Sequence, residues 1–365
     1  MEIYIGFDRQ HRLFRNPVEE LRTQNPDELP RLFARIESAL GAGYFVAGFL
    51  SYEAGQAFEP VLGGTVEADF PLLHFGVFKS MEAGPLPGIG ETPAPVERKL
   101  AIDYEAYRRN IDQIRNYIRQ GEVYQITYCV KNLLRYHGDA TALFRRLLRL
   151  QPVPYPALVL AEDYKLLSLS PELFFRKTGA DIVTKPMKGT WRRGNNFVSD
   201  WMNRRKLHFD PKNRAENVMI ADLMRNDLGR IGTKVRVPRL FEVASYTTLH
   251  QMTSTVTAQV PSQIPVFDLF RALFPSGSVT GAPKIRAMQI IRELEAGPRC
   301  IHTGAIGYLT PAREMFFNVA IRSMLLRGTA GEMGVGGGIV WDSTPAGEYE
   351  ECQIKSAFLD GGPGG

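Results

Sequence analysis

Hydrophobic positions recur with helical spacing along several stretches of the chain. Between residues 104 and 120, Tyr107, Ile111, Ile114 and Ile118 lie three or four positions apart, which is the period of a helix with one buried face. Gly121 is placed to end this helix. The same reasoning predicts helices over residues 142–150, 214–228, 266–273 and 283–294, and a last helix from about Pro345, a residue suited to a first turn.

Other stretches alternate with the period of a strand. Tyr124, Ile126, Tyr128 and Val130 share one face of residues 123–130. Further strands are predicted over residues 44–50, 72–78, 157–161, 166–169 and 315–326. Strands and helices follow one another without a regular β-α-β rhythm, so we expect an α+β fold rather than a parallel Rossmann-type sheet.

A segment rich in glycine and proline divides the chain. Residues 84–95 hold seven Gly or Pro among twelve, which is typical of a linker or a long loop. We therefore expect an N-terminal strand-containing region over residues 1–95 and a catalytic region over residues 96–365. With 365 residues, 44% of them hydrophobic and 23% charged, the composition is that of a folded globular protein.

Charge and cysteine content narrow the function classes. The net charge of +5 is spread over the sequence without a dense basic stripe, which disfavours a nucleic-acid binder and suits an enzyme with a small polyanionic substrate. The three cysteines are widely spaced and form no zinc or disulfide pattern. No signal peptide and no apolar stretch long enough for a membrane span is recognised, so we expect a cytoplasmic protein.

The glycine-rich segments of the chain do not match the nucleotide-binding motifs. The segment Gly-Ser-Val-Thr-Gly-Ala-Pro-Lys at residues 277–284 has three residues between its glycines and Ile285 after the lysine, so it is not a P-loop. It opens a predicted helix, whose free N–H groups suit an anion such as a carboxylate. On spacing alone, a plain turn between two helices is favoured.

Three carboxylates and two lysines are further candidates for residues of a functional site. Glu216 lies in the first turn of a predicted buried helix, and Glu348, Glu351 and Lys355 share one face of the last helix. Spacing alone favours a solvated Glu351–Lys355 pair, and the alternative is magnesium between Glu216 and Glu351. Lys188 follows a short strand in a Gly/Pro turn, where a lone lysine is usually a solvated charge.

Several ordered segments within residues 103–358 together resemble the chorismate-utilising enzymes. That family includes anthranilate synthase component I, aminodeoxychorismate synthase component I, and the isochorismate and salicylate synthases. The matching segments are residues 121–125 (GEVYQ), 170–174 (SPELF), 185–190 (KPMKGT), 216–227 (ENVMIADLMRND), 277–284 (GSVTGAPK), 304–308 (GAIGY), 318–322 (NVAIR), 336–340 (GGGIV) and 348–355 (EYEECQIK).

The resemblance implies a fold and a site. It implies an α+β fold in which two large antiparallel β-sheets pack as a sandwich with helices outside, and an active site between the sheets. It implies Lys188 as a nucleophile, Glu172 as a general acid, and Mg²⁺ held by Glu216 and Glu351, with Glu348 as a further metal ligand. The residues implied in binding substrate are Gln125, Thr190, Thr280, Gly281, Tyr308, Arg322, Gly336, Gly337 and Lys355.

Two positions distinguish the branches of the family. The isochorismate and salicylate branch carries a water-activating lysine where Gln125 stands, and anthranilate synthases carry alanine where Lys188 stands. Pro-Met-Lys-Gly-Thr at residues 186–190 resembles the Pro-Ile-Lys-Gly-Thr of the aminodeoxychorismate branch. The resemblance thus implies amination of chorismate at ring carbon 4, on the route to para-aminobenzoate and folate. The alternatives are anthranilate synthesis and a non-catalytic chorismate-binding protein.

The source of ammonia is expected to be a second protein. A glutaminase needs a nucleophilic cysteine on a tight, glycine-flanked turn with a histidine nearby, and Cys129, Cys300 and Cys352 do not fit. The family resemblance implies a separate glutamine amidotransferase subunit.

Overall fold

Two antiparallel sheets organise the computed structural model, which describes residues 1–7, 10–62, 69–84, 86, 94–246 and 249–360. In order across the first sheet, the strands are β16 (Gly281–Ala282), β8 (Gln125–Arg135), β20 (Ala330–Ile339), β19 (Ser323–Arg327), β10 (Lys165–Ser170), β9 (Tyr155–Leu160), β1 (Glu2–Phe7), β2 (Gln10–Phe14) and β6 (Glu82–Ala83), and β7 (Glu97–Leu100) also pairs with β8.

The second sheet has the same size in the described part of the chain. Its order is β13 (Met187–Arg192), β15 (Leu249–Gln259), β12 (Asp181–Lys185), β11 (Leu173–Thr178), β18 (Met315–Val319), β17 (Ala305–Leu309), β4 (Phe45–Leu50), β5 (Leu73–Phe78) and β3 (Glu19–Thr23), with β14 (Thr233–Ser245) beside β15. Strands from before residue 84 therefore join both sheets, β1 beside β9 and β4 beside β17.

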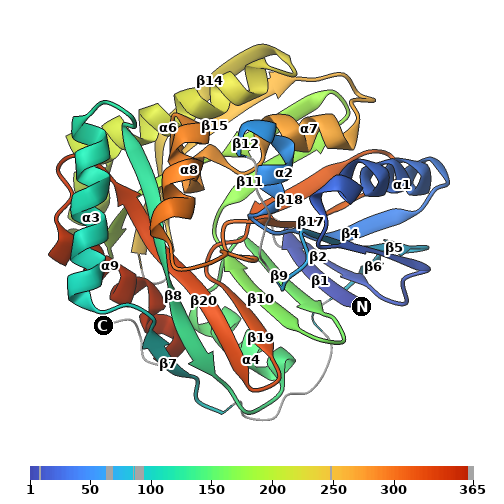
Figure 1. Cartoon of the computed structure of the whole chain (residues 1–365), viewed down its shortest axis with the longest axis horizontal. Helices are drawn as coiled ribbons and strands as arrows, with labels where there is room; N and C mark the ends of the chain where they lie inside the picture. The colour runs from blue at the N-terminus through green and yellow to red at the C-terminus, as the bar shows by residue number, and fades with distance from the viewer. Residues whose placement is uncertain (8–9, 63–68, 85, 87–93, 247–248, 361–365) are drawn as a thin grey trace.

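The core forms layers between and outside the sheets. Side chains of β1, β9 and β10 meet those of β4 and β17 between the sheets. Helices α3 (Tyr104–Arg119), α4 (Ala140–Leu150), α8 (Lys284–Leu294) and α9 (Pro345–Ser356) cover the outer face of the first sheet, and α1 (Leu29–Gly41), α6 (Pro211–Gly229) and α7 (Val266–Leu273) cover that of the second. In Figure 1, α3 and α9 flank the β8 side of the first sheet, whereas α1 and α7 lie together against the second. The α+β sandwich expected from the sequence is thus confirmed.

The strand predicted over residues 315–326 is wrong in one respect. It is two strands, β18 and β19, which belong to different sheets. The chain crosses between the sheets at residues 320–322, where Arg322 adopts a left-handed backbone conformation with φ of 52°. No glycine or proline marks this turn, so the apolar pattern runs through it unbroken.

The helix predicted over residues 214–228 begins earlier than expected. Asp210 caps it by accepting a hydrogen bond from the Asn213 backbone N–H, and Pro211 occupies its first position. Glu216 consequently lies in the second turn rather than the first. The helix is also less buried than predicted, because Val218 is exposed.

The sequence also predicted a division of the chain near residue 95. The linker predicted over residues 84–95 lies mostly outside the described residues, so the division at residue 95 stays a prediction.

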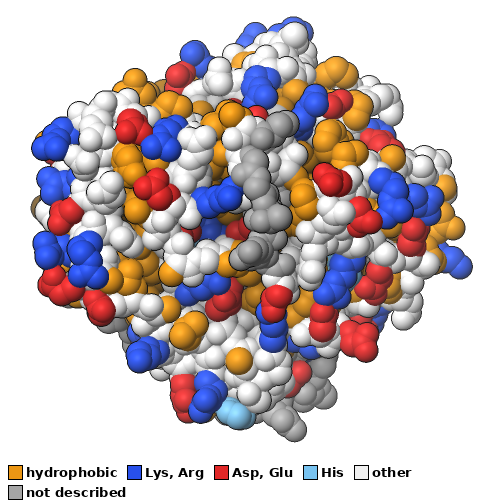
Figure 2. Space-filling view, viewed as in Figure 1, with side chains coloured by type: hydrophobic (Ala, Val, Ile, Leu, Met, Phe, Trp, Pro, Cys, Tyr) orange, Lys and Arg blue, Asp and Glu red, His pale blue; other side chains and the backbone are white. Residues whose placement is uncertain are grey.

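Acidic and basic side chains are interspersed over the face of the molecule seen in Figure 2, in line with the dispersed charge of the sequence. None of the helices in the described ranges has both the length and the apolar character needed to span a membrane.

Candidate active site

Lys188 lies on β13, at the edge of the second sheet, and α6 holds its backbone in place. The Asn217 side-chain amide, next to Glu216 in α6, donates a hydrogen bond of 3.2 Å to the Lys188 carbonyl. Burial lowers the pKa of the Lys188 amine below its ordinary value, while the charges of Glu216 and Glu172 oppose this shift. The net direction favours the neutral amine, which is the nucleophilic form.

Glu172 lies on the turn between β10 and β11 and is 3% exposed. Burial raises the pKa of its carboxyl to about 7, against the lowering effects of the Ser278 hydroxyl, the Lys188 charge and the Met187 backbone N–H. The Ser278 hydroxyl donates a hydrogen bond to Glu172 Oε1. A carboxyl group with this pKa is partly protonated near neutral pH, so it can donate a proton to a leaving group.

Hydrogen bonds from Arg299 and Thr127 hold the loop that carries Ser278. The Arg299 guanidinium donates to the Val279 carbonyl at 2.9 Å and to the Thr127 carbonyl at 2.7 Å, and the Thr127 N–H donates to the Thr280 carbonyl at 2.7 Å. The Thr280 hydroxyl donates to the Ser276 carbonyl at 3.2 Å, and its role in binding substrate stays a prediction. Neither Ser278 nor Arg299 was predicted from the sequence as a residue of this site.

Glycines bring the first sheet close to the predicted catalytic groups. A Cβ on Gly281 would lie 2.2 Å from the Gln125 carbonyl, and one on Gly338 would lie 2.0 Å from Gln125 Nε2 and 3.0 Å from Lys188 Nζ. The side chains of Gln125 and Lys188 therefore converge on Gly338. Gln125 is fully buried, and neither polar atom of its amide has a partner among the described residues. Because an unpaired buried amide costs about 1–3 kcal/mol, it suits a polar ligand here.

The predicted metal ligands approach one another from α6 and α9. Burial, with a smaller contribution from the Glu351 charge, raises the pKa of Glu216. Burial also raises the pKa of Glu348, whose Oε1 accepts a hydrogen bond of 2.7 Å from Ser343, and the Glu351 charge adds to that shift. A Cβ on Gly337 would lie 2.8 Å from Glu348 Oε2 and 3.6 Å from Glu351 Oε1.

These carboxylates fit a cation with few protein ligands. Among the described residues, no group of three or more His, Cys, Asp or Glu side chains is close enough to hold a metal ion. Two carboxylates that repel each other, together with substrate oxygens and water, are a set that magnesium accepts. The Glu351–Lys355 pair favoured by spacing is present: Lys355 Nζ donates to Glu351 Oε1 and to the Gly336 carbonyl, both at 2.6 Å.

Arg322 is a cation that faces the same site. Burial lowers the pKa of its guanidinium to about 10, and the nearby Tyr246 hydroxyl opposes the shift. Burial raises the pKa of Tyr246, the Arg322 charge opposes this shift, and the Glu172 charge adds to it, so Tyr246 lies close enough to both charges to interact with them. In the described part of the chain, Arg322 has no carboxylate partner, so its fork of N–H donors suits a substrate carboxylate. Tyr246 was not predicted from the sequence.

Tyr308 and Thr190, which were predicted to bind substrate, lie in different environments from each other. The Tyr308 ring stacks on Phe316 with centroids 5.2 Å apart and packs against Phe7 and Phe14 between the sheets. This packing gives Tyr308 a place in the core, and its predicted role in binding substrate stays a prediction. Thr190 is exposed on β13, opposite Gln251 of β15.

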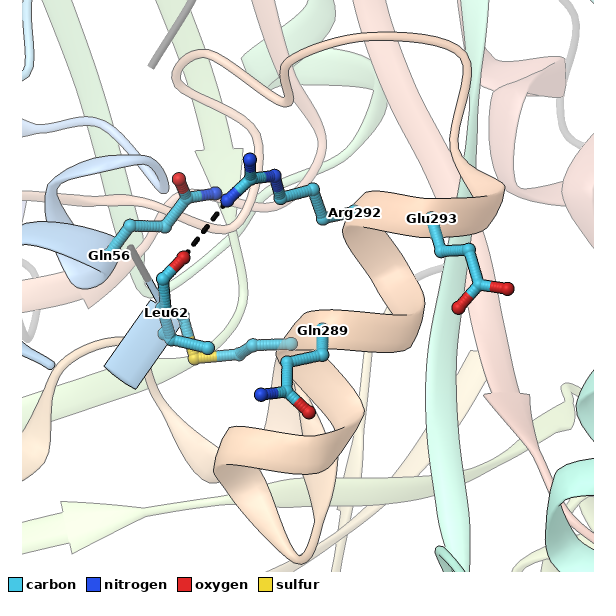
Figure 3. A pocket seen from close by; sticks show the side chains of 6 residues that line it. Gln56, Leu62, Gln289, Arg292 and Glu293 are labelled. Atoms are coloured by element: carbon cyan, nitrogen blue, oxygen red, sulfur yellow. Dashed lines mark hydrogen bonds between the residues drawn. The ribbon is translucent and has the colours of Figure 1, made fainter. Parts of the chain in front are cut away.

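A separate surface pocket of about 300 Å³ lies between α2 (Ala54–Phe58) and α8. Its lining includes Gln56, Leu62, Gln289, Arg292 and Glu293, and Arg292 donates a hydrogen bond of 2.9 Å to the Leu62 carbonyl (Figure 3). No residue of the predicted active site lines it.

The family model described as chorismate binding enzyme matches residues 3–360. Aminodeoxychorismate synthase component 1 from Klebsiella aerogenes is 43% identical over 253 residues, which cover 69% of this chain and 56% of that protein. The chain thus spans just over half the length of this relative. Anthranilate synthase component 1 from Methanothermobacter marburgensis is 33% identical over 370 residues, covering 93% of this chain and 79% of that protein.

Solved structures agree with the sequence match. Anthranilate synthase component I from Streptococcus pneumoniae superposes with a TM-score of 0.84 at 25% identity, over 98% of this chain and 92% of that one. The family model covers nearly the whole sequence, and the superposition covers nearly the whole chain. The chain therefore belongs to the family of chorismate binding enzymes.

Proposed function

We propose that this chain aminates chorismate at ring carbon 4 with ammonia and gives 4-amino-4-deoxychorismate, on the route to para-aminobenzoate and folate. The observation that carries the proposal is Lys188, where anthranilate synthases have alanine. Its amine has a lowered pKa, and it lies within reach of Glu172, whose pKa is about 7. A neutral amine and a protonated carboxyl group are the two forms that the first step needs.

In that step, the Lys188 amine forms a bond to ring carbon 2. The two ring double bonds shift toward carbon 4, and the carbon 4 hydroxyl leaves as water after it takes the Glu172 proton. Ammonia then forms a bond to carbon 4, the double bonds shift back, and the bond to the lysine breaks. The proton lost by the incoming ammonia balances the one that Glu172 gave.

The substrate is a dicarboxylate, and the site offers positive charge for it. We assign one carboxylate to Arg322, whose buried guanidinium supports this role. Glu216 and Glu351, with Glu348 nearby, are the residues that would hold Mg²⁺, which when bound supplies positive charge that offsets the other carboxylate. Gln125 offers an unpaired buried amide beside the nucleophile.

The ammonia is proposed to come from a glutamine amidotransferase subunit. All three cysteines are buried and free. Burial raises the pKa of Cys129 to about 12 and that of Cys352 to about 11, and it raises the pKa of Cys300 as well. None of these thiols is suited to be the thiolate that a glutaminase requires.

The test is the product formed from chorismate, ammonium and magnesium, identified by mass. We expect 4-amino-4-deoxychorismate from the wild-type chain, and an adduct on Lys188 when ammonia is left out. Lys188→Ala should lose the adduct and most of the turnover. The similarity to anthranilate synthase over 93% of the chain favours one second candidate, and anthranilate with pyruvate as the main products would establish it instead.

A further inference from the structure

Helix α5 (Phe197–Phe209) presents its apolar side chains to solvent. Phe197 is 85% exposed, Trp201 51% and Phe209 54%, and Val198 and Met202 are exposed as well. At 100° per residue, these five positions form one stripe on the side of the helix opposite Leu207, the residue of α5 that is buried. We call these five residues the α5 stripe. An ordinary surface helix turns such a stripe inward, so an outward one marks an interaction surface.

Positive charge accompanies the α5 stripe. The Arg205 guanidinium lies over the rings of Trp201 and Phe209, 5.4 Å from each centroid. Arg204 and Lys206 are its neighbours, and within the described ranges none of the three forms an ion pair with a carboxylate. The acid of this helix, Asp200, is already engaged by Arg193 and His250. The stripe is therefore an apolar surface with one cation, Arg205, lying over two of its rings, and Arg204 and Lys206 beside it.

A pocket opens beside the stripe. It has a volume of about 460 Å³, and its walls are Trp201, Arg204, Arg205, His208 and Phe209 of α5 and residues 240–243 of β14. Half-exposed Leu240 adds to its apolar surface. A hollow of this size next to an exposed tryptophan gives an incoming side chain a place to be buried, which is how interface anchors bind.

The inner side of α5 is fixed to the elements of the active site. The Asn203 amide donates to the Arg192 carbonyl at 3.2 Å, at the end of the strand that carries Lys188. Asp200 accepts hydrogen bonds from the Arg193 guanidinium and from the Gly194 N–H at 2.9 Å. At Asp210 the helix leads directly into α6, which carries Glu216. A protein seated on the α5 stripe would thus sit behind the reactive lysine.

We propose that the α5 stripe is the docking surface for the ammonia-supplying subunit, whose matching surface is apolar with acidic side chains opposite Arg204, Arg205 and Lys206. This inference rests on the proposed function. Ammonia is mostly protonated in bulk solution near pH 7, so a supplier is useful only close to the nucleophile's strand. A second copy of this chain fits less well, because a two-fold contact would bring the same unpaired cations of the two stripes together without carboxylates from the stripe to pair with them.

The test separates glutamine-supported from ammonium-supported turnover. The chain is assayed with the glutamine amidotransferase subunit of the same organism, once with glutamine and once with ammonium at alkaline pH. The variant is Trp201→Glu. The matched control is Trp341→Glu, because Trp341 is 50% exposed and also lies under an arginine, Arg115, at 5.5 Å. Loss of an interface anchor weakens binding about 30-fold or more.

We expect Trp201→Glu to lose glutamine-supported turnover by at least about tenfold and to keep ammonium-supported turnover, with Trp341→Glu unchanged in both. Equal glutamine-supported turnover in all three proteins would overturn the inference. So would a loss of ammonium-supported turnover in Trp201→Glu. So would sedimentation showing that the stripe mediates self-association or binding to anionic lipid vesicles.

A failure of the proposed function is distinguishable from a failure of this inference. If the wild-type chain makes no aminodeoxychorismate from ammonium, the proposed function fails. Sedimentation of the two purified subunits then still tests the docking surface. A complex that forms with Trp341→Glu and not with Trp201→Glu supports it, and a complex that forms equally with both contradicts it.

Discussion

The hydroxyl of Ser278 is expected to set the pH range in which Glu172 donates its proton. Ser278 has one hydroxyl hydrogen, and it donates this hydrogen to Glu172 Oε1. Its 2.9 Å contact with the Ser276 hydroxyl must then have Ser276 as the donor. Both serines are buried, so water cannot readily replace either bond.

The magnitude follows from the strength of such a bond. A hydrogen bond to a charged group contributes about 1.5–3 kcal/mol, and each pKa unit corresponds to about 1.4 kcal/mol. Ser278→Ala should therefore raise the pKa of Glu172 by roughly one to two units above its value of about 7. A general acid must be protonated, so the alkaline fall of the reaction rate should move to higher pH by the same amount.

The assay is the rate of Lys188 adduct formation across neutral and alkaline pH, measured without ammonia so that ammonium does not titrate in the same range. Ser276→Ala is the matched control, because it keeps the Ser278–Glu172 bond and removes only the donor behind it. Ser276→Ala should shift the pH–rate profile in the same direction as Ser278→Ala, by a smaller amount. An alkaline limb that stays in place or moves to lower pH in Ser278→Ala would refute the reasoning.

Three further predictions concern other charged groups. Burial raises the pKa of Glu53 to about 7, so the protonated carboxyl stabilises the fold below its unfolded pKa, and this stabilisation is lost as pH rises through 7. Between about pH 5 and pH 8, the free energy of unfolding of the wild type, measured in urea, should fall by roughly 2–3 kcal/mol relative to that of Glu53→Gln. Glu351→Gln should weaken Mg²⁺ binding measured by calorimetry, and an unchanged affinity would contradict the assignment. Arg322→Lys should raise KM for chorismate about tenfold or more, since it removes bidentate pairing, and a KM equal to that of wild type would exclude Arg322 from the substrate.

Local periodicity accounts for the helices that bury an apolar face. Residues 104–120 and 266–273 were predicted nearly to the residue, because α3 and α7 each pack one apolar side against a sheet. Helix α5 was missed because its apolar residues face outward and its buried face holds little besides Leu207. The crossing at residues 320–322 was missed because a left-handed arginine leaves no mark in a pattern of apolar residues.

The candidate site depended on the family resemblance far more than on spacing. A lone lysine in a turn gives no sign that Glu172, sixteen positions earlier, lies beside it; only the pairing of β11 and β12 brings the two segments together. Tyr308 was assigned by its motif, and the motif does not tell that its ring is packed between the sheets. Ser278 and Arg299 act through contacts with distant residues, so no local pattern could have identified them.

Burial and charge compete at Lys188, and their balance decides whether the site is reactive. Burial drives both the lysine and Glu172 toward their neutral forms, whereas attraction between the amine and nearby carboxylates favours the inert ion pair. Glu216 is the largest contributor to that attraction. Glu216→Gln should therefore lower the pKa of Lys188 further, and an amine-reactive reagent should label it faster at a given pH when magnesium is chelated. Lys206, an exposed lysine on α5, serves as the internal reference for labelling. Slower labelling of Lys188 in Glu216→Gln would show that the Glu216 charge does not hold the amine protonated.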